Sequence, residues 1–522
     1  MPFRKNKAQR VSVGSKKRSI WTLVTLVIAA VTLAFSGAPA FTDSNSVLAS
    51  IPNLQPFPDP SGAIATFSSA GAIDQTNPFF QELGTNGRRC VTCHEPSDAF
   101  SVTPPHLRER FEVTQGTDPI FRPVDGASCP TADVSTVGER REAYGLLLSR
   151  GLIRVGIALP ANADYYVKSV DNPYGCNATD VISMYRRPLP STNLPFLSAV
   201  MFDGRESTPV TGTTKIVYGN YPASFLTDLA HQSVDATIIH AEGNGTRPTT
   251  EEQQQIVDFE TKLFTAQVRD RQAGDLSEDG ANGGPTSLAT QPFFITINSS
   301  VHFLLPGFEQ PGGLVTPGDG QFTSSIFNLY NNWAQVARSQ YDERTAARQS
   351  IARGEQLFNT LPIPITGVAG INDDVAAGGL VAGGIASLQG TCGTCHDTPN
   401  VGNHSFPTPL NIGTGDPSPS NRFVNLGGLD LQYLPVITVC RNGAIHDCKT
   451  TSDLGQALID GKFDHVGKIK GPILRGLAAR APYFHNGSAA TLEDVMDFYQ
   501  TRFNLGLTDQ QKSDLVAFLK SL

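Results

Sequence analysis

Three features are scarce in this sequence of 522 residues. After residue 35 it has no apolar run long enough to cross a bilayer, which excludes a protein that spans the membrane several times. It has no excess of positive charge, because 40 Lys and Arg stand against 48 Asp and Glu, and such a chain is not expected to bind nucleic acid. It has no short-period repeat, and only one five-residue pattern recurs.

The one long apolar run, IWTLVTLVIAAVTLAF, lies near the N-terminus. It follows a stretch with seven Lys and Arg and no acid, and it leads into the small-x-small sequence Ala38-Pro39-Ala40. Residues 1–40 are therefore predicted to be a signal peptide cleaved after Ala40, which gives a periplasmic or secreted protein. The run is also long enough for an uncleaved anchor, the one case in which membrane attachment is expected. Cleavage would take the net charge from −8 to −15 and favour basic partners.

Four of the eight cysteines form two copies of one pattern, CVTCH at 90–94 and CGTCH at 392–396. The pattern C-x-x-C-H is the attachment signature of c-type haem, because two thiols one turn apart can each form a thioether while the adjacent His binds the iron. A zinc site of four cysteines is the alternative, but zinc requires no His after the second Cys. Two covalently bound haem c groups are predicted, attached at Cys90, Cys93, Cys392 and Cys395, with His94 and His396 as proximal iron ligands.

The other four cysteines are an even number in an oxidising compartment. Cys129 and Cys176 lie between the two haem motifs, and Cys440 and Cys448 lie after the second motif. The disulfides Cys129–Cys176 and Cys440–Cys448 are therefore predicted. Free buried thiols are the alternative.

The chain has 49 Gly and 36 Pro, which favour long irregular connections between regular elements. A mainly α fold with long irregular loops and little sheet is expected. Two cytochrome c-like haem domains are expected, at 41–345 and 346–522, with a helical stretch before each motif, at 77–89 and 345–360. A capping box at Thr250 and Gln253 predicts a further helix that carries Ile256, Phe259 and Leu263 on one face.

Two further segments complete a family resemblance, MFDGRES at 201–207 and GPILRGLAARAPYFHNGSAATLEDV at 471–495. With the two C-x-x-C-H motifs, they resemble the bacterial di-haem cytochrome c peroxidases, a family that includes MauG. The likeness is close from about residue 350 onward and looser before it, where 95–180 reads as an insertion. It implies a peroxidase that reduces hydrogen peroxide at the His94 haem, with electrons relayed through the His396 haem from a small cytochrome, a cupredoxin or a protein substrate.

The resemblance also implies site residues near the His94 haem. Phe202 matches an aromatic residue that lies between the haems, and Gln232 and Glu242 match the Gln and Glu that lie over the peroxide-binding haem. A carboxylate such as Glu242 in an apolar pocket can move the proton during O–O cleavage, and His240 could share this work or bind the iron. His106 is the candidate distal ligand in the loop after the first motif, but its neighbouring prolines favour an exposed bend and an open haem.

For the second haem, the resemblance implies a sixth ligand fourteen residues after His485, which is Tyr499. The helix predicted to start at Thr491 carries Met496 and Tyr499 on one face, so periodicity alone leaves both open and also fits a plain core stripe. A Tyr ligand, as in MauG, would lower the haem potential, whereas Met would raise it. His485 itself is expected near the haem edge.

Calcium is a further implication, held by backbone carbonyls near Arg480 and Pro482. Arg187 stands where the family has an Asn that completes this site, so calcium stays open. Alternative functions are a MauG-like oxidase of a protein substrate, a di-haem oxygenase that uses O₂ to cleave polymers such as rubber, and a non-catalytic di-haem electron carrier.

Overall fold

The computed structural model describes residues 50–197, 199–208, 223–291, 327–335, 342–377, 379, 381–396 and 409–522. These residues belong to one compact unit. The predicted signal peptide lies outside them. Among the helices of the described ranges, none combines the length and the apolar character that a membrane span needs.

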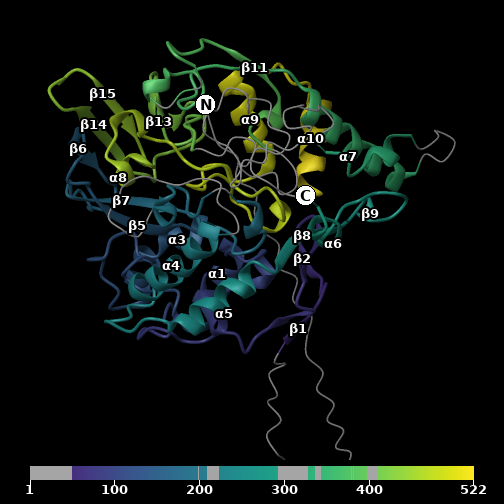
Figure 1. The fold of residues 1–522 in the computed structure, drawn as a ribbon, viewed down its shortest axis with the longest axis horizontal. Coiled ribbons are helices and arrows are strands. Elements are labelled where there is room, and N and C mark those ends of the chain that lie inside the picture. Colours follow the sequence, from purple (N-terminus) through teal and green to yellow (C-terminus); the bar gives the residue numbers. More distant parts are fainter. Residues whose placement is uncertain are drawn as a thin grey trace, which may run out of the picture. The chain divides into compact units, whose positions relative to one another are not determined.

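The described α-helices are α1 (Pro104–Thr114), α2 (Val137–Ala143), α3 (Gly145–Arg150), α4 (Ala223–Ile239), α5 (Thr250–Glu260), α6 (Pro285–Ala289), α7 (Glu343–Thr360), α8 (Ala457–Asp460), α9 (Leu492–Phe503) and α10 (Asp509–Lys520). Helices α7, α9 and α10 pack together (Figure 1), and their apolar faces meet in a core that includes Trp333, Phe358 and Phe518.

The strands form six small sheets in the part of the chain that the structure describes. One has four strands in the order β2 (Phe57–Asp59), β3 (Gly62–Ser68), β8 (Leu263–Asp270), β9 (Gly274–Asp275), and one has three in the order β15 (Cys448–Thr451), β14 (Val436–Arg441), β6 (Tyr165–Asp171). The others are pairs: β1 (Ser50–Pro52) with β4 (Ala72–Asp74), β5 (Ile153–Ala158) with β7 (Val181–Arg186), β10 (Ile363–Ile365) with β11 (Leu388–Gly390), and β12 (Pro417–Ser418) with β13 (Asn421–Asn425).

The prediction of a mainly α fold is therefore wrong. Of the residues that the structure describes, 33% are helical and 20% are in strands or bridges, a mixed α/β arrangement. The strands are short, and some are rich in β-branched residues, as in VITVCR at 436–441. Two of the pairings, β3 with β8 and β6 with β14, join segments far apart in the chain. Gly and Pro content indicates irregular connections, but it does not show which short segments between them become strands.

The helix predictions had mixed outcomes. Helix α7 confirms the stretch at 345–360, with Asp342 as N-cap accepting from the Thr345 N–H. The stretch at 77–89 forms only a short 3₁₀ turn, Pro78–Phe80, and Gly87 later adopts a left-handed φ of 80° that a helix excludes. The third helix is present as α5, but its capping box is one residue earlier, at Thr249 and Glu252, and strand β8 begins at Leu263.

One sheet joins the two predicted halves of the chain. Strand β6, from the predicted insertion, pairs antiparallel with β14, placing Val170 opposite Ile437 (Figure 1). The adjoining β14–β15 hairpin is closed by the Cys440–Cys448 disulfide, and Cys129 is bonded to Cys176. Both predicted disulfides are thus confirmed, and strand pairing crosses the predicted boundary at 345/346.

Candidate haem sites

The first C-x-x-C-H motif forms a tight turn. Cys90–Thr92 is a 3₁₀ helix, and the backbone N–H groups of Cys93 and His94 both donate to the Cys90 carbonyl at 3.1 Å. The turn directs both thiols and the imidazole into one cavity, hereafter the His94 cavity. Neither thiol takes part in a disulfide.

The His94 ring is oriented for metal binding. Its Nδ1 donates to the carbonyl oxygen of Phe100 at 3.1 Å, and the ring lines the cavity. Burial lowers the pKa of His94 to about 4, so the ring is neutral, the form that binds a metal. A carbonyl partner on the second ring nitrogen is the usual support for a His ligand.

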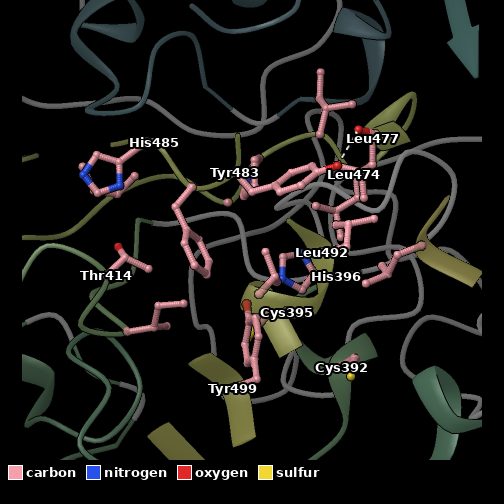
Figure 2. A pocket seen from close by; sticks show the side chains of 18 of the residues that line it. Cys392, Cys395, His396, Thr414, Leu474, Leu477, Tyr483, His485, Leu492 and Tyr499 are labelled. Carbon is pink, nitrogen blue, oxygen red and sulfur yellow. Dashed lines mark hydrogen bonds between the residues drawn. The ribbon is translucent and has the colours of Figure 1, made fainter. Parts of the chain in front are cut away.

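The second motif repeats this geometry. Cys392–Thr394 is a 3₁₀ helix, and the N–H groups of Cys395 and His396 donate to the Cys392 carbonyl at 3.3 and 3.0 Å. Cys392, Cys395 and His396 line a second cavity, hereafter the His396 cavity (Figure 2).

Both cavities fit haem c. Their walls are mostly apolar, as the surroundings of a haem macrocycle are. Each presents two unpaired thiols and one imidazole, the donor set that attaches a haem and binds its iron. The two Cys pairs line different cavities and do not converge, so a single zinc site of four cysteines does not fit.

The two cavities meet at a shared wall, formed by residues 187–190, Phe202, Lys470 and Ile473, which line both. The Lys470 N–H donates to the Phe202 carbonyl at 2.7 Å, tying the two segments together. The Phe202 ring contacts the ring of His485 edge-on, with centroids 5.9 Å apart. Phe202 therefore lies in the wall that separates the two cavities.

Helix α4 forms one wall of the His94 cavity through Gln232, Ser233, Ala236 and Thr237, and His240 follows directly after it. The His240 Nδ1 donates to Asp125 at 2.5 Å, and Arg88 forms an ion pair with the same carboxylate at 2.6 Å. Burial opposes ionisation of Asp125, but the charge of Arg88 and the bond from His240 hold its pKa below the usual value. The His240 ring is thereby held at the cavity wall by a buried anion.

Glu242, in contrast, lies outside this cavity. Helix α4 ends at Ile239, and Glu242 itself has a left-handed φ of 49°, which turns the chain away. Its side chain is exposed, and its carboxylate accepts a hydrogen bond from Asn86 at 2.9 Å. The structure thus separates Glu242 from Gln232, which does line the cavity, and the expectation of a buried acid at 242 is not met.

A different carboxyl lines the His94 cavity. Glu260, at the end of α5, is 5% exposed, and its Oε2 has no hydrogen-bond partner among the described residues. Burial raises the pKa of Glu260 to about 8, so it is protonated at neutral pH. The sequence analysis missed it, although Glu260 follows Ile256 by four residues and therefore lies on the apolar face of its helix.

The helix that carries the candidate sixth ligands is capped as predicted. The Asp494 N–H donates to Thr491 Oγ1 at 3.1 Å, and the Thr491 N–H donates to the Asp494 carboxylate at 2.9 Å. Both Met496 and Tyr499 line the His396 cavity. Figure 2 shows the Tyr499 hydroxyl directed into the cavity on the side of His396. Burial raises the pKa of the Tyr499 phenol.

The two other candidate histidines, His485 and His106, have different surroundings. The His485 ring lines the His396 cavity, with Nε2 3.7 Å from Asp453, and burial lowers its pKa to about 4. His106 lies on α1, where its Nδ1 is 2.7 Å from the Asp98 carboxylate, and it does not line the His94 cavity.

The guanidinium of Arg187 binds backbone carbonyl oxygens where calcium is expected. Its guanidinium donates to the backbone carbonyls of Val102, Arg150 and Arg480, at 2.7, 3.0 and 3.1 Å. A guanidinium already supplies the positive charge that a calcium ion would bring to the Arg480 carbonyl.

Residues 470–505 match a family model described as RoxA-like, cytochrome c-like. This segment is cytochrome c-like. It contains Lys470, Arg480, His485, Met496 and Tyr499, all of which line the His396 cavity. The similarity implies covalently bound haem c.

The chain is also similar to proteins named cytochrome-c peroxidase. It is 40% identical over 68 residues to IdrP1 of Denitromonas iodatirespirans, covering 11% of this chain and 18% of that protein. It is 40% identical over 78 residues to IdrP2 of the same organism, covering 14% and 21%, and 38% identical over 68 residues to IdrP1 of Pseudomonas sp. (strain SCT), covering 11% and 18%. The chain thus matches between 18% and 21% of the length of these relatives.

Proposed function

We propose that the protein is an exported di-haem c-type peroxidase that reduces hydrogen peroxide at the His94 haem, with electrons relayed through the His396 haem. The observation that carries this proposal is the shared wall: two cavities with the same C-x-x-C-H geometry meet at Phe202 and Lys470. The similarity to cytochrome-c peroxidases supports the reaction class.

The His94 cavity offers groups for proton transfer. Haem iron supplies the binding position for peroxide and the route for electrons. The overall reaction takes one H₂O₂, two electrons and two protons to two waters. We assign to His240 the transfer of the proton from one peroxide oxygen to the other, since an imidazole can accept and return a proton near neutral pH. Asp125 holds the His240 ring, and Gln232 can donate a hydrogen bond to peroxide.

In the second cavity, Tyr499 would be the further protein ligand of the iron, and Phe202 would pack in the wall between the two haems. The proposed electron donor is a small cytochrome or a cupredoxin, or a protein substrate as in MauG. A donor with a basic surface suits the net negative charge of the chain.

Stopped-flow spectroscopy of the purified protein with hydrogen peroxide tests the proposal. His240→Gln is expected to slow the peroxide step by about 10²–10⁴-fold, the usual cost of losing an acid/base group. His231→Gln is a matched control, because His231 lies on α4 but pairs with Glu206 and does not line the cavity. Glu242→Gln is expected to react like the wild type.

An unchanged rate in His240→Gln would remove His240 from the mechanism. A wild type with two low-spin haems and no reaction with peroxide would instead be an electron carrier, and a protein that carries bound O₂ as isolated would be an oxygenase.

A further inference from the structure

Lys470 is a buried cation with no anionic partner among the described residues. Its side chain is 1% exposed, and its ammonium has no hydrogen bond or ion pair with any residue that the structure describes. The bond from its backbone N–H to Phe202 places it in the shared wall, where it lines both cavities.

An isolated buried ammonium is costly, so proteins pair it or let it lose its proton. Burial alone lowers the pKa of Lys470 to about 7. Lys468, two residues earlier and also buried, shows the usual solution: its Nζ donates to the Ala377 carbonyl at 2.8 Å and lies 3.7 Å from the Asp373 carboxylate. Lys470 lacks such a partner among the described residues, and it lines both the His94 cavity and the His396 cavity.

Haem c carries the missing anions. Each haem has two propionate carboxylates, which remain free when thioethers and a His hold the macrocycle. We propose that Lys470 is a shared propionate site, whose ammonium pairs with one propionate of each haem. The inference requires haem c at both motifs and does not depend on a reaction with peroxide.

Arg480 provides a cation for one haem only. It lines the His396 cavity and not the His94 cavity. Its Nη2 donates to the carbonyls of Ile473 and Arg475 at 2.6 and 2.9 Å, whereas its buried Nε has no described partner. The two cations therefore predict different patterns: Lys470 acts on both haems, and Arg480 acts on the His396 haem alone.

The electrostatic consequence is measurable without turnover. A positive charge beside a haem disfavours the oxidised state, which carries one more positive charge than the reduced state. Lys470 is therefore expected to raise both midpoint potentials.

The test is spectroelectrochemical titration of the holoprotein, with resonance Raman spectra of the propionate bending modes. In Lys470→Met, both midpoint potentials are expected to fall and the propionate bands of both haems to shift. Lys468→Met is the matched control and should leave both potentials unchanged, whereas Arg480→Gln should lower only that of the His396 haem. Lys470→Arg, which keeps the charge, should restore both potentials close to the wild-type values.

A shift of only one haem in Lys470→Met, or of neither, would overturn the shared site. If Lys470→Met does not fold, Lys470→Gln removes the same charge and is measured in the same way. If the wild type does not react with peroxide, the proposed function is refuted, but the predicted shifts of the two midpoint potentials still hold.

Discussion

At the scale of single residues, burial sets the charge of the side chains that line the two cavities. His94 is neutral, and Glu260 is protonated at neutral pH. Arg187 keeps its charge, and its guanidinium donates to three backbone carbonyl oxygens. The pKa of each of these residues differs from its value in an unfolded chain, so each links the stability of the fold to pH.

Glu260 predicts a loss of stability as the pH rises. Its pKa is raised from 4.5 to about 8 in the folded protein. Between these values the folded state binds the proton and the unfolded state does not, so the free energy of unfolding falls with pH by up to about 1.4 kcal/mol per unit. Denaturant unfolding of Glu260→Gln from pH 5 to 8 should show a smaller fall. Glu251→Gln, exposed on the same helix, should keep the wild-type slope; equal slopes in all three proteins would refute the prediction.

The sixth ligand of the second haem can be decided by two substitutions. Tyr499→Phe is expected to change the spectrum of the His396 haem and raise its potential, because a phenolate ligand donates charge to iron. Met496→Leu should leave that spectrum as in the wild type, since it preserves the apolar packing of α9. If only the Met change alters the second haem, the Tyr assignment is wrong.

Arg187 predicts that stability does not depend on calcium. The wild-type thermal midpoint should be the same in calcium and in a chelator, because the guanidinium already binds the carbonyls of Val102, Arg150 and Arg480. Arg187→Asn removes these bonds and should lower the midpoint, at a cost of about 1.5–3 kcal/mol for each charged hydrogen bond lost. A wild-type midpoint that rises with calcium would contradict this account.

At the scale of elements, the caps and turns place the ligands. The 3₁₀ turn of each motif aims two thiols and one imidazole into one cavity. The cap of α9 sets where the helix starts, and therefore which turn carries Met496 and Tyr499. A helix start shifted by one residue would rotate these side chains by about 100° around the axis.

Thr491→Ala tests this cap. Losing the hydroxyl that accepts from the Asp494 N–H should lower the free energy of unfolding by ~1 kcal/mol. Thr501→Ala is the control on the same helix, since Thr501 is exposed near its other end. Chemical denaturation of the two variants gives the comparison, and an equal effect would mean that the cap contributes nothing specific.

At the scale of the whole molecule, the first half of the chain is bound to the second through a buried ion network. Arg186, at the end of β7, forms ion pairs with Asp453 at 2.6 Å and with Asp203 at 2.5 Å. All three side chains are nearly inaccessible, and Asp203 directly follows Phe202 in the shared wall. Burial opposes the charge of Asp203, but Arg205 and Arg186 lower its pKa to about 2, so it is ionised at neutral pH.

Arg186→Met should therefore be strongly destabilising. It leaves the buried Asp453 without its ion-pair partner and Asp203 with Arg205 alone, a loss of about 3–5 kcal/mol. Arg422→Met is the matched control, because Arg422 pairs with Asp171 at 3.0 Å across exposed surface and should cost only ~0–1 kcal/mol. Denaturant unfolding of both variants measures the difference, and similar values would show that the network does not hold the halves together.

The sequence by itself determined the features whose chemistry lies within a few residues. The spacing of C-x-x-C-H is a covalent requirement of one turn, so the two haem motifs were readable without a fold. The Thr491 cap and the helix at 345–360 depend on neighbours in the chain, and the Cys440–Cys448 disulfide joins residues only eight apart. Even here, nearby alternatives such as Thr249 and Thr250 differ by one residue in a way that propensity does not resolve.

Only the tertiary structure decided which side chains face the cavities. His240 meets Asp125 across 115 positions of sequence, and β6 pairs with β14 across the predicted domain boundary. Glu242 has the right spacing from Gln232, but the chain turns after α4 and exposes it, while Glu260 and Lys470 are buried without any motif to mark them. The physical reason is that burial and charge pairing depend on which distant segments pack together, and local pattern does not contain that information.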